Sequence, residues 1–92
     1  MKDNRNRFIL ERNYLIQRQK EMGLTIERAA DLLEISPRYF RYILSGFRGS
    51  RMSSSLGAKI CKVFGFARIQ FLELEDQYQS EAERIKKSVK SK

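Results

Sequence analysis

The stretch that decides the fold is residues 24–46, which read LTIERAADLLEISPRYFRYILSG. Apolar residues recur there at spacings of three and four, the period of a helix with one buried face. Thr25 precedes the first apolar run, and Ser36-Pro37 precedes the second. A hydroxyl side chain, or a hydroxyl followed by proline, favours the start of a helix, and Gly46 favours an end. The stretch therefore predicts a helix-turn-helix whose connection is centred on Glu34 and Ile35.

The sequence on either side predicts further helices and no strand. A helical stripe precedes Gly23, a second follows the capping residue Ser53 and stops at Gly65, and a third continues toward the end of the chain. The expected helices are residues 8–22, 25–33, 36–45, 53–64 and 67–88. We therefore predict an all-α fold of five helices with an extended C-terminal helix. We expect residues 1–7 to be a flexible basic arm, residues 8–76 to form the domain, and residues 77–92 to be a helical extension.

Composition limits the classes of function. The 92 residues carry a formal net charge of +8, which favours an acidic partner such as nucleic acid. The chain has no histidine, no Gly-rich phosphate loop and one cysteine, Cys61, which we expect to be buried in the core. We therefore expect no catalytic site, no metal, no cofactor and no disulfide. No apolar stretch is long enough to cross a bilayer, so we expect a cytoplasmic protein that does not bind membranes.

The positive charge is concentrated in one window. Between Glu34 and Glu73 there is no acidic residue. The basic residues of this window are Arg38, Arg41, Arg48, Arg51, Lys59, Lys62 and Arg68. The helix expected at 36–45 turns its apolar residues to one side and only Arg and Tyr side chains to the other. Such a face is suited to binding a polyanion.

Residues 24–66 resemble the lambda-repressor-like family of DNA-binding domains, also called the Xre or Cro/C1 type. The positions that carry the resemblance are Leu24, Thr25, Ala29, Ala30, Leu33, Ile35, Ser36, Phe40, Ile43, Gly46, Met52, Ser53, Leu56, Ile60, Cys61, Phe64, Gly65 and Phe66. With the helix before them, the resemblance covers about residues 8–74. It implies a five-helix domain that places its third helix in the major groove of duplex DNA.

Three features depart from the family pattern. Ile26 stands where the family usually has a glutamine that braces a phosphate, so the amide that makes this contact is absent. Glu34 stands where glycine is common, which requires a strained backbone or a slightly different turn. Many members pair an arginine late in the first helix with a glutamate late in the third; here both positions, Gln19 and Leu44, are uncharged. Because both charges are missing together, no unpaired charge remains.

The resemblance implies DNA contacts from the outward positions at the start of the third helix. These are Ser36, Pro37, Arg38, Tyr39, Arg41 and Tyr42. We expect Arg38 and Arg41 to contact base edges or the groove edge, because a guanidinium can donate two hydrogen bonds to guanine. The tyrosines can bond a phosphate or pack on a thymine methyl. Flanking contacts are expected from Thr25, Arg48, Arg51, Ser53 and Ser54. The alternative, a solvated charged face with an ordinary capped helix beside it, stays open.

Both ends of the chain could add contacts. The basic arm, with Lys2, Arg5 and Arg7, either reaches a neighbouring groove or is disordered. On the last helix, apolar side chains recur at Phe71, Leu74, Tyr78, Ala82 and Ile85. We expect the later ones to have nothing in their own chain to cover them, which favours dimerisation through this helix. A solvated single helix and a different protein partner are the alternatives.

The sequence thus favours a DNA-binding transcriptional regulator, a repressor or controller protein that binds operator DNA as a homodimer. An antitoxin-like or adaptor protein, whose last helix binds another protein and for which DNA is secondary, is the second hypothesis. A basic protein that binds nucleic acid without sequence preference is the third.

Overall fold

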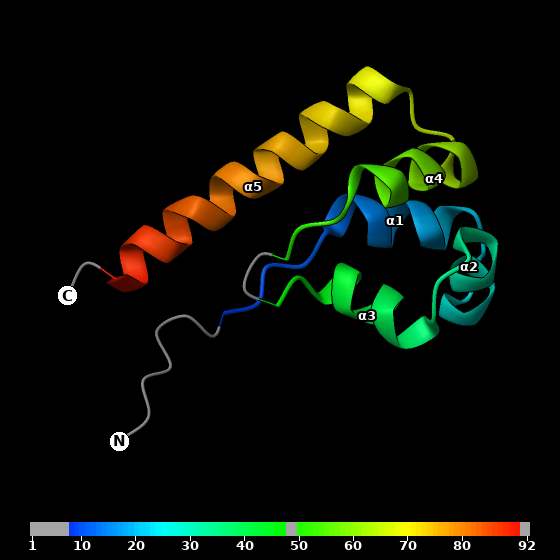
Figure 1. The fold of residues 1–92 in the computed structure, drawn as a ribbon, viewed down its shortest axis with the longest axis horizontal. Helices are drawn as coiled ribbons and strands as arrows, with labels where there is room; N and C mark the ends of the chain where they lie inside the picture. The colour runs from blue at the N-terminus through cyan, green and yellow to red at the C-terminus, as the bar shows by residue number, and fades with distance from the viewer. Residues whose placement is uncertain (1–7, 48–49, 91–92) are drawn as a thin grey trace.

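The computed structural model describes residues 8–47 and 50–90, with only the backbone described for the last three of these. The described chain contains five helices (Figure 1). They are α1 (Asn13–Glu21), α2 (Ile26–Leu33), α3 (Pro37–Ser45), α4 (Ser54–Phe64) and α5 (Arg68–Lys90). No β-strand occurs in the described residues, so the predicted all-α fold with a long C-terminal helix is confirmed. The arm at 1–7 and Arg48 lie outside the described residues.

Three predicted helix starts are confirmed by side-chain caps. The hydroxyl oxygens of Thr25, Ser36 and Ser53 each accept a hydrogen bond from the backbone N–H three residues later, at 3.0, 3.0 and 3.1 Å. Each such bond satisfies an N–H that has no partner within its helix. The short polar residues before each apolar run therefore fix where α2, α3 and α4 begin.

Glu34 ends α2 with a left-handed backbone, at φ 62°. The Ile35 N–H donates to the Ala30 carbonyl at 3.0 Å, which closes the helix end and turns the chain toward α3. A residue with a side chain adopts this conformation at a cost. The expected strain at the turn is therefore present.

The first helix begins later than the sequence predicts. Residues 8–12, called here the N-terminal strap, are extended instead of helical. The Leu10 N–H donates to the Gly46 carbonyl at 3.1 Å, the Arg12 N–H donates to the Leu44 carbonyl at 3.0 Å, and Ile9 forms an antiparallel bridge with Phe47. The prediction of a helix from Phe8 was wrong because these backbone groups pair with the end of α3 and the residues that follow it. Figure 1 shows the strap beside that segment.

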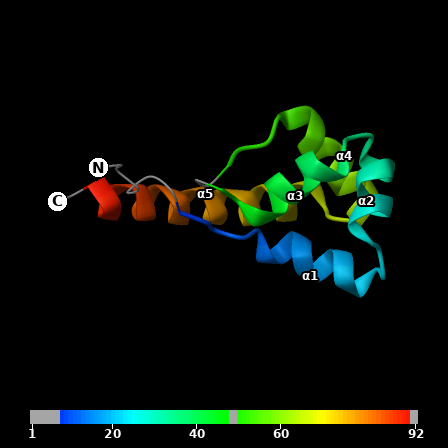
Figure 2. The ribbon, with the colours of Figure 1, turned by 90° about the horizontal axis from the view of Figure 1, so that it is seen from below.

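The core lies where α1 to α4 and the start of α5 meet. Its buried residues are Leu15, Ala29, Ala30, Leu33, Phe40, Ile43, Leu44, Leu56, Ile60, Phe64 and Phe71. Cys61, expected in the core, is only partly buried at its edge. Helix α5 continues beyond the bundle as a single projecting helix (Figure 2), so its first part belongs to the core and its last turns do not.

The expected dimerisation residues divide along α5. Tyr78 and Ala82 are only 7% and 1% exposed within the single chain. The expectation that nothing in the chain covers them was wrong. The strap covers Tyr78, and its Leu10 carbonyl accepts a 2.6 Å hydrogen bond from the tyrosine hydroxyl. Phe71 is also buried, while Leu74 and Ile85 are partly buried. The large apolar side chains that α5 exposes are instead Ile69 and Leu72.

Candidate nucleic-acid interface

The packing of α3 decides which of its side chains point to solvent. Phe40, Ile43 and Leu44 are buried. Successive residues of an α-helix are turned by about 100°, so residues 38, 42 and 45 lie on the opposite side and residues 39 and 41 on the two flanks. Arg38, Tyr39, Arg41 and Tyr42 are all exposed. Ser36 is exposed and uses its oxygen to cap the helix, and Pro37 is partly buried.

The two arginines of α3 differ in their surroundings. Arg41 reaches across to the first turn of α2, where its Nη2 lies 3.2 Å from a carboxylate oxygen of Glu27. Both side chains of this pair are more than half exposed, so the pair is weak and open to exchange. The side chain of Arg38 makes no hydrogen bond or ion pair with any described residue. Its five N–H groups are therefore available to a ligand.

Tyr39 and Tyr42 form a stacked pair on the same surface. Their ring centroids lie 6.4 Å apart and their planes differ by 16°. The two residues are 39% and 44% exposed, so one side of an aromatic pair is open to solvent beside Arg38. Together, Arg38, Tyr39, Arg41 and Tyr42 are called the α3 face below.

The expected flanking residues do not all gather at the α3 face. Thr25 is exposed at the start of α2, two residues before Glu27, which pairs with Arg41. Arg51 is exposed, and its side chain has no partner among the described residues. Ser53 and Ser54 line a shallow hollow with residues of α5, among them Arg68 and Leu72. They therefore mark a second surface at the start of α4.

Ile26, where the resembling family has a glutamine, is partly buried and packs against the core. It lines a hollow between α1 and α3 together with Gln19, Arg41 and Leu44. Its side chain has no group that could donate to a phosphate, which leaves α2 with Thr25, the exposed Arg28 and the backbone N–H groups at its start.

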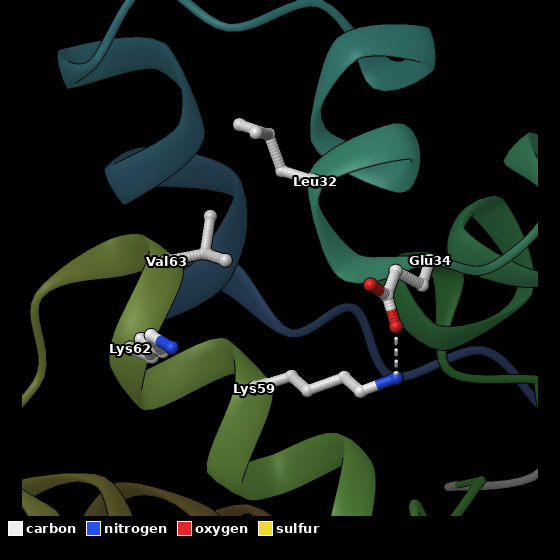
Figure 3. A pocket seen from close by; sticks show the side chains of 5 residues that line it. All are labelled: Leu32, Glu34, Lys59, Lys62 and Val63. Carbon is white, nitrogen blue, oxygen red and sulfur yellow. Dashed lines mark hydrogen bonds and ion pairs between the residues drawn. The ribbon is translucent and has the colours of Figure 1, made fainter.

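A hollow lies between α2 and α4 (Figure 3). It has a volume of about 430 Å³ and is lined by Leu32, Glu34, Lys59, Lys62 and Val63. Leu32 and Val63 point into the gap, and the Lys59 ammonium lies 3.1 Å from the Glu34 carboxylate. Of the two lysines in this hollow, Lys59 is therefore paired with a carboxylate, and Lys62 has no ion-pair partner among the described residues.

The residue that sequence reasoning missed is Arg12. It is fully buried and donates five hydrogen bonds, one for each of its N–H groups. Nε and Nη2 donate to the two carboxylate oxygens of Glu75, at 3.0 and 2.6 Å. Nη1 donates to the Ile43 carbonyl at 2.8 Å and to the Ser50 Oγ at 3.2 Å. Nη2 also donates to the Ser50 carbonyl at 2.5 Å. Its guanidinium also lies over the Tyr78 ring, 4.2 Å from the centroid.

Arg12 therefore joins the strap, the end of α3, the segment before α4, and α5. Burial by itself would raise the pKa of Glu75, but the hydrogen bonds from Arg12 and Tyr14 outweigh it, and the pKa lies below its usual value. Burial raises the pKa of Tyr14, and its hydrogen bond to the Glu75 carboxylate adds to this. The Arg12 cluster, defined as Arg12, Tyr14, Ser50, Glu75 and Tyr78, fixes the elements that flank α3.

No local sequence signal identifies this role, because the hydrogen-bond partners of the Arg12 guanidinium lie 31 to 63 positions away in the chain. Throughout residues 8–47 and 50–90, no group of three or more His, Cys, Asp or Glu side chains is arranged to hold a metal ion. Within the same residues, no helix combines the length and apolar character needed to cross a bilayer.

Comparisons of the chain with models of known protein families, with curated proteins and with solved structures found no significant match. What the α3 face can do must therefore be argued from its own geometry and charge.

Proposed function

We propose that this protein is a sequence-specific DNA-binding transcriptional regulator that inserts α3 into the major groove. The observation that carries the proposal is the α3 face, where two arginines and two tyrosines are exposed and α3 has no acidic residue. The major groove of B-DNA is wide enough for an α-helix, and arginine is the commonest reader of guanine there. A surface of this composition has more to gain from a polyanion than from any neutral partner.

The charges of the window between Glu34 and Glu73 support the same interpretation. In the window without acidic residues, Arg38, Arg51, Lys62 and Arg68 are exposed and have no ion-pair partner among the described residues. Arg41 and Lys59 are held only by exposed carboxylates, Glu27 and Glu34. Phosphates can replace such carboxylates at little cost because exposed ion pairs are weak. Unpaired cations from one window of the chain without acidic residues leave positive charge that phosphates can neutralise.

The test is a gel shift across a range of salt concentrations, using a duplex selected from a random library. We expect the chain to enrich a defined site and the Arg38→Ala and Arg41→Ala variants to bind it more weakly. Both side chains are exposed, so the variants should keep the fold, which circular dichroism can check. Equal affinity of the unaltered protein and both variants for the selected site would contradict the proposal.

The homodimer is part of the proposal, with a different surface from the one expected from the sequence. Because Tyr78 and Ala82 are buried within the chain, an interface on α5 would have to use exposed side chains such as Ile69 and Leu72. Sedimentation analysis of the protein and of a Leu72→Lys variant tests this. If the dimer persists in both the Leu72→Lys and the Ile69→Lys variants, its interface lies elsewhere.

The second candidate, an adaptor or antitoxin-like protein, is favoured by the same exposed pair. Ile69 and Leu72 are 72% and 52% exposed and lie one turn apart on α5. A truncation near residue 76 would be a poor test, because it removes Tyr78 from the Arg12 cluster. Capture of a partner that is lost with Leu72→Lys, while DNA affinity is unchanged, would favour this candidate.

A further inference from the structure

The α3 face carries more aromatic surface than phosphate binding requires. Tyr39 and Tyr42 stack on each other with one side open, and Tyr42 lies on the outermost line of α3 together with Arg38. An exposed aromatic pair that extends from the flank of a helix to its outermost line is a surface that is stabilised when an apolar group covers it. Base edges in the major groove offer one apolar group, the methyl on carbon 5 of thymine.

We infer that the Tyr39–Tyr42 pair reads a C5-methyl pyrimidine in the half-site that α3 contacts. The inference rests on the proposed function and deepens it, because it names the base feature that this surface selects. Two bases can supply the group, thymine and 5-methylcytosine, and both present it at the same place in the groove.

The position of Arg38 tells where the methyl should lie. Arg38 and Tyr42 are four residues apart on one line of α3, which corresponds to about 6 Å along the helix axis. Base pairs are spaced about 3.4 Å apart. If Arg38 donates to a guanine, the methyl pyrimidine therefore falls within about two base pairs of that guanine. A selected site should contain both bases in each half.

The alternative use of the tyrosines is a hydrogen bond from a hydroxyl to a phosphate. The two uses depend on different atoms, since a methyl contact needs the ring and a phosphate contact needs the hydroxyl. The direction of Tyr42 favours the ring, because the outermost line of a docked helix faces base edges while its flanks face the two backbones. Phenylalanine keeps the ring and removes the hydroxyl, so it separates the two uses.

The experiment uses the full chain and the site selected from a random duplex library. Each thymine is replaced in turn by deoxyuridine, which removes only the methyl, and affinity is measured by fluorescence anisotropy. We expect one replacement in each half-site to weaken binding by about fourfold, the value for one buried methyl group at about 0.8 kcal/mol. Tyr42→Phe should keep this sensitivity, and the double variant Tyr39→Ala, Tyr42→Ala should lose it.

A second arm distinguishes the two sources of the methyl. At the sensitive position the T·A pair is replaced by C·G, with cytosine or with 5-methylcytosine. If the duplex with 5-methylcytosine binds more tightly than the duplex with cytosine, the protein contacts the methyl group of either base. If these two duplexes bind equally while deoxyuridine still weakens binding, the contact is restricted to thymine.

The outcomes separate the inference from the function on which it rests. If a site is selected and bound but no deoxyuridine weakens binding, the inference is overturned and the proposed function stands. Sensitivity that persists in the double variant, or a loss with Tyr42→Phe as large as with Tyr42→Ala, overturns it as well. If no site is enriched, the proposed function fails and the inference with it.

Discussion

The guanidinium of Arg12 and the carboxylate of Glu75 meet at 2.6 Å, although 63 positions separate the two residues in the chain. Arg12 is fully buried and the Glu75 side chain is 16% exposed, so water screens this pair far less than the exposed pairs at the surface. The same guanidinium holds carbonyl oxygens at the end of α3 and before α4. One buried cation thus sets the positions of four segments.

Removing this cation should destabilise the fold strongly. We expect Arg12→Met to lower the free energy of unfolding by about 3–5 kcal/mol, because it removes the guanidinium that donates to a largely buried carboxylate and to two carbonyls. Urea denaturation followed by circular dichroism measures the loss. Arg18→Ala breaks an exposed pair with Glu21 and a 2.8 Å hydrogen bond to the Phe64 carbonyl, and should cost less than half as much. The double variant Arg12→Met, Glu75→Leu should recover part of the loss; no recovery would mean that the pair is not the cause.

The pH dependence of stability should follow the shifted groups of the Arg12 cluster. The pKa of Glu75 lies below its usual 4.5, so its contribution is fully present above pH 4.5 and is lost as the pH falls through the folded pKa. Tyr14 has a raised pKa, so its contribution is present below its usual 10.0 and declines above it. The chain has no histidine to titrate between pH 5 and 8. We expect a flat thermal stability in that range and a loss below pH 4.5 that is smaller in Glu75→Gln. An equal acid loss in Glu75→Gln would contradict this.

Gly46 and Gly23 provide a matched pair for testing the strap. Both have a left-handed backbone, at φ 66° and 68°, so alanine costs about 1 kcal/mol of strain at either position. A methyl group at Gly46 would also collide with the Leu10 carbonyl and the Tyr78 hydroxyl, whereas no neighbouring atom of the described residues lies within 4 Å of a methyl group at Gly23. We expect Gly46→Ala to lower the free energy of unfolding by at least about 2 kcal/mol more than Gly23→Ala. Equal losses would mean that the strap does not pack against α3 and α5.

The helices could be predicted because their signals are local. Thr25, Ser36 and Ser53 precede apolar runs with helical spacing, and each caps a helix through a bond to a residue three positions away. Left-handed residues such as Gly46 end helices for an equally local reason. The α3 face follows from the same spacing, because burial of Phe40 and Ile43 leaves Arg38 and Tyr42 outside.

The strap and the Arg12 cluster could not be predicted because their partners are distant in sequence. Phe8 to Arg12 have apolar spacing compatible with a helix, and only pairing with residues 44–47 makes them extended. That pairing then places Leu10 against Tyr78. The predicted exposure of Tyr78 was wrong for the same reason, since a strap that the sequence did not reveal covers it.

Glycine at position 34, in the turn between α2 and α3, should stabilise the fold. Glu34 has the one positive φ among described residues other than glycine, and its carboxylate makes only an exposed pair with Lys59. We expect Glu34→Gly to raise the free energy of unfolding by about 0.5–1 kcal/mol, because relief of the strained backbone exceeds the weak ion pair. Glu34→Gln keeps the strain and removes the charge, so it should change stability by less than about 0.5 kcal/mol. Destabilisation by glycine would show that the ion pair or the helix end matters more than the strain.

The two arginines of the α3 face should have separable effects on DNA binding. Arg38 lies on the outermost line of α3 and has no partner among the described residues, so we expect Arg38→Ala to weaken binding to a selected site by about 1–3 kcal/mol and to change affinity for random duplex little. Arg41 lies on the flank, held by Glu27, where a phosphate contact is expected. Arg41→Ala should weaken binding to both duplexes alike and reduce the salt slope by about one. Anisotropy titrations at several salt concentrations measure the affinity of each variant for each duplex. Glu27→Gln removes the carboxylate that holds Arg41, so it should strengthen binding to both duplexes. If Arg38→Ala weakened binding to both duplexes equally, Arg38 would be a phosphate contact and the reading of bases would have to come from the tyrosines alone.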